Sequence, residues 1–148
     1  MSKKLLAFVL MLLTVLSLFG TAASAAERTD NVIMPRYQNV VNYVIDFYVT
    51  SGGQLCVTAD YDGTPSTFTQ AKITVEIEKK FLGLFWFTVD IGYEDDLWVA
   101  YSTDVNGSFI NTFASDGTGT YRANIKLEIS GMFGTDDVIE KTIECVYQ

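Results

Sequence analysis

The chain has 148 residues, with 18 acidic and 10 basic side chains and a formal net charge of −8 at pH 7. A surface this acidic repels nucleic acid and anionic membranes, and the sequence has no basic stripe that would bind nucleic acid, so we exclude nucleic acid as a partner. There is no histidine, which removes Ser/His and Cys/His nucleophiles and the usual imidazole metal ligands. We therefore expect no enzymatic activity, no cofactor and no histidine-based metal site.

The chain begins with the three-part pattern of a secretory signal peptide. Lys3 and Lys4 precede an apolar run over residues 5–19, and small residues follow, ending in Ala23-Ser24-Ala25. The run is shorter than the roughly 20 residues that a membrane-spanning helix needs. We expect a signal-peptide helix in residues 1–25, cleavage after Ala25 and secretion to the cell exterior. An uncleaved membrane anchor is the alternative.

Cleavage would leave 123 residues, which is long enough for one domain with a hydrophobic core. These residues carry 8 basic and 18 acidic side chains, a net charge near −10. They contain no cysteine next to the cleavage site that could carry a lipid and no second long apolar run. The expected organisation is an irregular polar segment over residues 26–39 and a single domain over residues 40–148, with no membrane anchor after signal cleavage.

From residue 40 onward, apolar and polar residues alternate with a period of two, which is typical of strands that bury one face. The third and fourth segments are expected to form a hairpin that spans residues 72–91. The expected strands cover residues 41–49, 55–61, 73–80, 85–91, 97–105, 109–113, 121–129 and 139–147.

Seven or eight short strands with frequent turns and no amphipathic helix predict an all-β fold, either a sandwich or a barrel. The segment Gly119-Thr120-Tyr121-Arg122-Ala123 is similar to the tyrosine corner of immunoglobulin-like domains, in which a Tyr precedes the usual Cys by two residues; here Ala123 takes that place. The sequence therefore favours an immunoglobulin-like antiparallel β-sandwich, with a barrel as the alternative.

Several short motifs together resemble a family of small exported immunoglobulin-like proteins from Gram-positive bacteria. They are a Pro-Arg-aromatic segment, a strand with a Cys, a hairpin with aromatics after its turn and a Tyr-Arg strand, found here at Pro35-Arg36-Tyr37, Cys56, residues 73–91 with Trp86, and Tyr121-Arg122. The chain departs from the pattern in its acidic segment near residues 94–96 and in its second cysteine. The resemblance implies a fold and an exported location, and it implies no activity.

The two cysteines, Cys56 and Cys145, are an even number in an exported chain, which favours a disulfide bridge. Closing a loop of this length would stabilise the fold by roughly 4 to 5 kcal/mol. The alternation places the two residues on opposite parities of their strands, which argues against the bridge. Two isolated buried thiols are the alternative.

Acidic residues gather in predicted turns, above all Glu94, Asp95 and Asp96. Clustered oxygen ligands suit a weak extracellular calcium site, and solvated turns are the alternative. Paired carboxylates can also catalyse glycoside hydrolysis when they are held at a set separation. Because these groups lie in turns, we expect no catalytic residue among them.

Two tryptophans are candidates for a binding surface. Phe85 and Phe87 share one face of their strand, so that Trp86 stands on the other face, and Trp98 alternates with apolar neighbours in the same way. If those neighbours form the core, both tryptophans point outward and make a patch with Tyr101 that could bind a protein or a sugar ring. Packing of both tryptophans at the sandwich edge or under a loop is the alternative.

These observations lead to one hypothesis about function and two alternatives. The hypothesis is a secreted, non-enzymatic extracellular domain that binds an unidentified protein or glycan. The first alternative is a carbohydrate-binding module that uses the same aromatic residues. The second is a structural component of the envelope or matrix that associates with itself through an unprotected edge such as the first strand.

Overall fold

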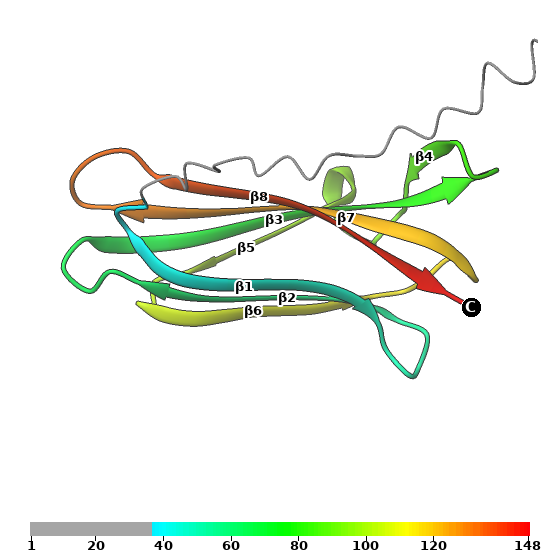
Figure 1. Ribbon diagram of the computed structural model, residues 1–148, viewed down its shortest axis with the longest axis horizontal. Helices are drawn as coiled ribbons and strands as arrows, with labels where there is room; N and C mark the ends of the chain where they lie inside the picture. Colours follow the sequence, from blue (N-terminus) through cyan, green and yellow to red (C-terminus); the bar gives the residue numbers. More distant parts are fainter. Residues whose placement is uncertain (1–36) are drawn as a thin grey trace, which may run out of the picture. The chain divides into compact units, whose positions relative to one another are not determined.

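The computed structural model describes residues 37–148, which form two antiparallel β-sheets packed face to face (Figure 1). The expected signal-peptide helix and its cleavage site lie outside the described residues. Within residues 37–148, no helix combines the length and the apolar character needed to cross a membrane. The elements are β1 (Val40–Val49), β2 (Leu55–Gly63), β3 (Phe68–Phe81), β4 (Phe85–Thr88), the 3-10 helix η1 (Glu94–Asp96), β5 (Leu97–Ser102), β6 (Asn106–Phe113), β7 (Gly119–Gly131) and β8 (Asp137–Tyr147).

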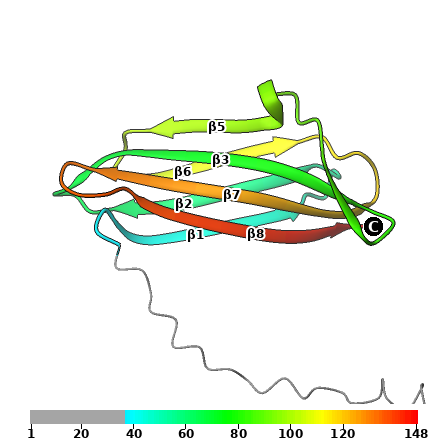
Figure 2. The same ribbon diagram turned by 90° about the horizontal axis from the view of Figure 1, so that it is seen from above.

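The strand order is that of an immunoglobulin-like sandwich, which confirms the predicted fold class and rules out the barrel. One sheet has the order β1-β2-β6. In the other sheet β3 and β7 are central, β8 pairs with β7, and β4 and β5 pair with successive parts of β3. The first, second and sixth strands therefore face the third, seventh and eighth, as in the immunoglobulin fold. Figure 2 shows the same two layers from above.

The core lies between the sheets and is formed by alternate residues of the strands. Along β3 the buried positions are Ile73, Val75 and Ile77, and along β7 they include Ile125 and Leu127. Ile73 pairs with Leu127, so that the two central strands present their apolar sides to the same interior. Full burial of each such side chain stabilises the folded state by roughly 1.5 to 3 kcal/mol. This interior is the main source of the stability of the fold.

A tyrosine corner joins β6 to β7, as the sequence predicts. The Tyr121 side chain is fully buried, and its hydroxyl donates a hydrogen bond to the carbonyl oxygen of Gly117 at 2.6 Å. Gly117 has a φ of 69°, a conformation that glycine adopts without steric cost. Ala123, which is also buried, takes the place of the usual cysteine. The corner therefore has its hydrogen bond and lacks the inter-sheet disulfide of antibody domains.

One buried carboxylate holds the segment that precedes β1. Asp137, at the start of β8, accepts hydrogen bonds from the backbone amides of Gln38, Asn39 and Val40 at 2.9, 2.6 and 3.1 Å. The Asn39 side-chain amide donates to the carbonyl oxygen of Thr135 at 3.1 Å. Residues 38 and 39 lie in the segment expected to be irregular, and they are tied to the other sheet although they are not part of a strand.

The two cysteines are free, so the predicted disulfide bridge is wrong. Cys56 alternates with the core residues of β2 and therefore points to the outer face of the three-stranded sheet, where it pairs with Tyr48 and Thr112. Cys145 lies on β8 and packs against the core from the other sheet. Two thiols on different faces of different sheets cannot form a bridge without moving the backbone.

We predict that the folded protein contains two thiols and that Cys145 reacts slowly. Burial raises the pKa of Cys145 to about 11, so that the reactive thiolate is scarce at pH 8. The pKa of Cys145 in the folded state lies above the value of 9.0 in the unfolded chain, so the folded state holds the thiol proton more tightly. The contribution of this group to the free energy of unfolding is therefore fully present below pH 9 and is lost as the pH rises toward 11. Alkylation followed by mass spectrometry should show two labels after unfolding without reductant, and labelling of folded Cys145 should increase steeply above pH 9. A mass increase on reduction would instead reveal a bridge.

Candidate interaction site at the β3–β4 hairpin

The predicted aromatic patch does not assemble, because Trp98 lies in the core. Its side chain is 7% exposed and meets the ring of Phe113 edge to face at 5.8 Å between centroids. Trp98 pairs with Val75, a buried position of β3, and this register turns Tyr101 to the outer face. Both parities of β5 are apolar, so alternation alone cannot assign its buried face, and the outward orientation predicted for Trp98 is wrong.

Trp86 lies on the outer face of the five-stranded sheet and is half-buried beneath two cations. The guanidinium carbon of Arg122 is 4.3 Å from the ring centroid, and the Lys80 ammonium is 5.1 Å from it. Arg122 donates through Nε to Glu78 at 2.5 Å, and Asn124 donates to the same carboxylate oxygen at 2.8 Å. The hydrogen bond from Arg122 lowers the pKa of Glu78, which keeps this carboxylate charged. Trp86 is therefore held in place by side chains from β3 and β7.

The acidic residues expected to bind calcium form the turn η1. Asp95 and Asp96 have φ values of 56° and 55°, and none of the three residues of η1 is buried. Within residues 37–148, no group of three or more acidic, Cys or His side chains is arranged to hold a metal ion. Glu94, Asp95 and Asp96 are therefore not brought together as a set of ligands.

Several exposed apolar residues lie together at the end of the β3–β4 hairpin. Buried positions along β3 end at Ile77, and β4 pairs only with residues 78–81, which lie beyond this buried part. The expectation that Phe85 and Phe87 belong to the core is therefore wrong. We call the five large apolar residues at this end the hairpin tip, and each is more than half exposed: Phe81, Leu82, Leu84, Phe85 and Phe87.

The turn of the hairpin has an unusual residue at its first position. Leu82 and Gly83 have φ values of 51° and 71°, and the Leu84 amide donates to the carbonyl oxygen of Phe81 at 3.1 Å. Positions with positive φ in such turns favour asparagine, aspartate and glycine, and a bulky residue there is rare. Leu82 is nevertheless 76% exposed. The turn geometry gives no reason for a leucine here, whereas a binding role for its side chain does.

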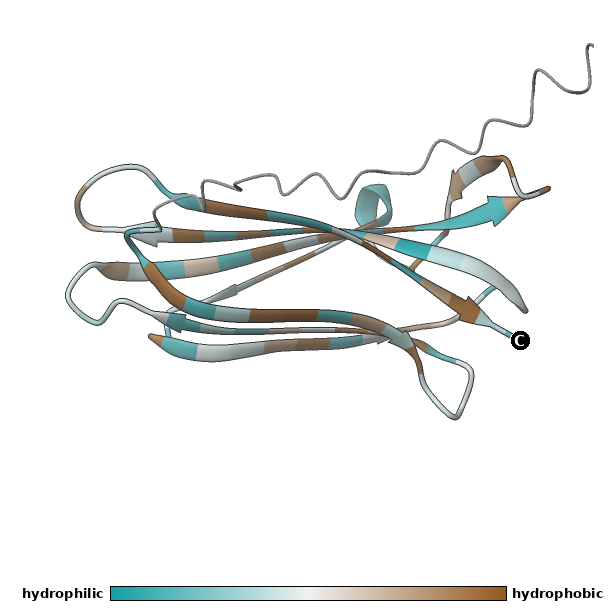
Figure 3. Ribbon diagram, viewed as in Figure 1, coloured by the Kyte–Doolittle hydropathy of each residue, from teal (hydrophilic) through white to brown (hydrophobic). Residues whose placement is uncertain are grey.

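The hairpin tip is apolar on its inner face and in its turn. Phe81 and Phe87 lie on the inner side, where their rings meet edge to face at 5.9 Å, and Phe85 pairs with Phe81. Trp86 lies on the opposite side, where Lys80 and Arg122 lie over its ring, and the two leucines form the turn. Figure 3 shows hydrophilic colour at the end of β3 giving way to hydrophobic colour in the turn and β4.

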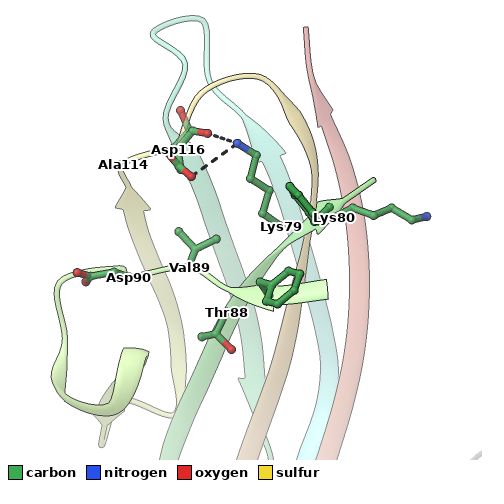
Figure 4. A pocket seen from close by; sticks show the side chains of 10 residues that line it. Lys79, Lys80, Thr88, Val89, Asp90, Ala114 and Asp116 are labelled. Carbon is green, nitrogen blue, oxygen red and sulfur yellow. Dashed lines mark hydrogen bonds and ion pairs between the residues drawn. The ribbon is translucent and has the colours of Figure 1, made fainter. Parts of the chain in front are cut away.

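Three cations surround the base of the tip, and we call Lys79, Lys80 and Arg122 the basic collar. Lys79 and Lys80 project to opposite sides of β3 (Figure 4). The Lys79 ammonium lies 3.8 Å from the Asp116 carboxylate and 5.4 Å from the ring centroid of Tyr121. On this inner side, an open groove of about 760 Å³ separates the hairpin from the β6–β7 connection. The collar therefore reaches both faces of the hairpin.

The sequence carries a signal for this site that the strand prediction does not use. Residues 81–87 read Phe-Leu-Gly-Leu-Phe-Trp-Phe, seven residues without a polar side chain, and the prediction places a turn inside them. Turns are normally polar, and exposed runs of more than three or four apolar residues are unfavourable unless they serve a function. An apolar turn is therefore the feature that points to this surface.

Comparison with known proteins finds no family model that matches the chain and no curated protein similar to it. The function is therefore inferred from the chemistry of the described residues.

Proposed function

We propose that the chain is an exported, non-enzymatic binding protein that contacts a component of the cell envelope through the hairpin tip. The observation that carries this proposal is the contiguous exposure of five large apolar side chains around one turn. With about 200 Å² for each fully exposed side chain, the tip presents roughly 600 Å² of apolar surface. The largest apolar patch on a typical soluble monomer is about 300 to 600 Å² and is often functional, so the tip is at the upper end of this range.

Export is supported by the signal-like pattern of residues 1–25 and by the resemblance to small exported proteins. The position of the site relative to the core supports a binding role. The tip lies beyond the buried part of β3, so it contributes contact surface without being needed for the packing of the sandwich. A rigid sandwich that carries a protruding hairpin is a common way to present a binding surface.

The carbohydrate-binding alternative has less support. A sugar ring stacks on a free aromatic face, whereas Arg122 and Lys80 already lie over the ring of Trp86. Trp98 is in the core. The tip itself offers apolar side chains without the polar groups that would orient hydroxyls. We therefore place the contact at the hairpin tip.

The proposal predicts that polar residues in the turn abolish envelope binding. In Leu82→Ser/Leu84→Ser, both substitutions are at side chains about three-quarters exposed, so the core keeps its packing. Fluorescently labelled protein is incubated with washed envelopes of the producing cells, and the bound fraction is measured after sedimentation. We expect the double variant to bind at least tenfold less than the wild type.

Phe133→Ser is the matched control. Phe133 is 72% exposed in the β7–β8 turn, at the opposite end of the sandwich from the hairpin tip (Figure 1). We expect this variant to bind like the wild type. Equal binding by the wild type and the Leu82/Leu84 variant, or no binding by either, would refute the proposed function.

A further inference from the structure

The surface chemistry of the tip also suggests what it binds. We propose that the hairpin tip inserts into the lipid bilayer surface of the cell membrane, with the basic collar at the level of the lipid phosphates. This inference rests on the proposed function and names its partner. It follows from the shape of the apolar surface, from the placement of cations and Trp86, and from the apolar area.

The shape of the apolar surface fits a surrounding medium better than a facing surface. A flat protein surface would cover only one side of the end of the hairpin, and the rest would remain in water. Here Phe81, Phe85 and Phe87 lie on the inner side, and the two exposed leucines form the turn at the end. Surroundings that are apolar around the whole turn remove all of this surface from water. The boundary between lipid headgroups and acyl chains provides such surroundings to a depth of roughly 5 to 10 Å.

One cation of the collar is available to a phosphate layer. Residues 37–148 contain 6 basic and 16 acidic side chains, and 3 of the 6 cations form the collar beneath the tip. Lys79 is paired with Asp116 and Arg122 with Glu78, whereas Lys80 makes no ion pair within the described residues. Lys80 and Arg122 lie over Trp86, so that an aromatic ring and cations share one level. Tryptophan and basic residues favour the level of the headgroups, where an apolar body and a polar end are both satisfied.

The apolar area favours a bilayer over a second copy of the chain. The tip offers roughly 600 Å² of apolar surface, whereas a stable protein–protein interface buries about 800 Å² on each partner. A symmetric contact through one face of the hairpin would use only part of that area. The bilayer accepts all of it and needs no matching shape.

The acidic remainder of the chain determines which bilayers bind well. Its net charge repels strongly anionic surfaces, as the sequence predicts, and this repulsion extends over a Debye length of about 8 Å at physiological salt. The contact that we propose is mainly apolar. It should therefore form on zwitterionic lipid, weaken as the fraction of anionic lipid rises at low salt, and persist in high salt.

The test is flotation of the exported protein with protein-free phosphatidylcholine vesicles, compared with vesicles that also contain phosphatidylglycerol. We expect the wild type to float with phosphatidylcholine and Leu82→Ser/Leu84→Ser to partition at least tenfold less. Phe133→Ser should match the wild type. All variants have the same N-terminus, so a difference between them comes from the hairpin.

Tryptophan fluorescence reports the depth of insertion. Trp98 is buried in the core and should not respond to vesicles, whereas Trp86 lies at the base of the tip. We expect a blue shift of emission and quenching by lipids brominated near the headgroup, and both effects should be absent in Trp86→Phe. Flotation without these changes would place the contact elsewhere on the molecule and would overturn the inference.

The remaining outcomes separate this inference from the proposed function. Envelope binding that depends on the tip, without flotation on either kind of vesicle, would identify a protein or glycan partner; the lipid inference would fail and the proposed function would stand. A dimer that depends on the tip and forms without lipid in size-exclusion chromatography would make a second copy the occupant and would also overturn the lipid inference. Absence of both envelope binding and flotation would overturn both proposals.

Discussion

The substitution Asp137→Ala should lower the free energy of unfolding by about 3 to 5 kcal/mol, because three backbone amides lose their acceptor at once. The carboxylate is 7% exposed and receives the amides of Gln38, Asn39 and Val40 at 3.1 Å or less. Among the described residues, the amides of Gln38 and Asn39 donate only to Asp137. Urea denaturation followed by circular dichroism measures the change.

Two further variants show whether the loss comes from these hydrogen bonds. Asp136→Ala changes the exposed neighbour and should alter stability by no more than about 0.5 kcal/mol. Asp137→Asn keeps the shape of the side chain and one oxygen acceptor. Its free energy of unfolding should therefore lie between those of Asp137→Ala and Asp136→Ala. If Asp137→Ala were as stable as Asp136→Ala, the attachment of residues 38–40 to β8 would contribute nothing to folding.

The second large effect is expected at the buried tryptophan. Trp98→Ala should lower the free energy of unfolding by about 3 to 5 kcal/mol, since it removes a core side chain that packs against Phe113 and leaves a cavity. Trp86→Ala should cost only about 1 kcal/mol, because Trp86 is half-buried and its contacts to Arg122 and Lys80 are partly solvated. Urea titration of the two variants gives both values.

The same pair of variants distinguishes the observed orientation of β5 from the orientation predicted by sequence. With Trp98 on the outside, the two substitutions would have similar and small effects. The emission of the wild type provides a second check, because a core tryptophan emits at short wavelength and shifts to the red only on unfolding. Similar stability of Trp98→Ala and Trp86→Ala would contradict the register between β5 and β3.

Binding and stability are assigned to separate parts of the molecule. The core ends at Ile77 on β3, and the proposed contact begins four residues later at Phe81. The collar residue Lys79 connects the two parts, because it lies over the ring of Tyr121 and reaches Asp116 in the turn before β7. Substitutions in the turn of the hairpin can therefore test binding while the sandwich remains folded.

The fold class could be predicted from the sequence because alternation is a local property. In β3 and β7 one parity is apolar and the other polar, so only one face can be buried, and the structure buries that face. The tyrosine corner could be predicted for the same reason, since Tyr121 bonds to a residue only four positions earlier. What the sequence by itself determined is thus the number and approximate positions of the strands, the sandwich and this corner.

The candidate site was decided only by the tertiary structure. Phe85 and Phe87 alternate like core residues, and they are exposed because β4 pairs with the end of β3 that extends past the buried interior. The orientations of Trp98 and of the two cysteines also follow from the tertiary structure. They are set by which neighbour each strand pairs with and by which sheet it joins. A period of two shows that a strand has two faces, but where the strand ends relative to the opposite sheet depends on contacts between residues far apart in the chain.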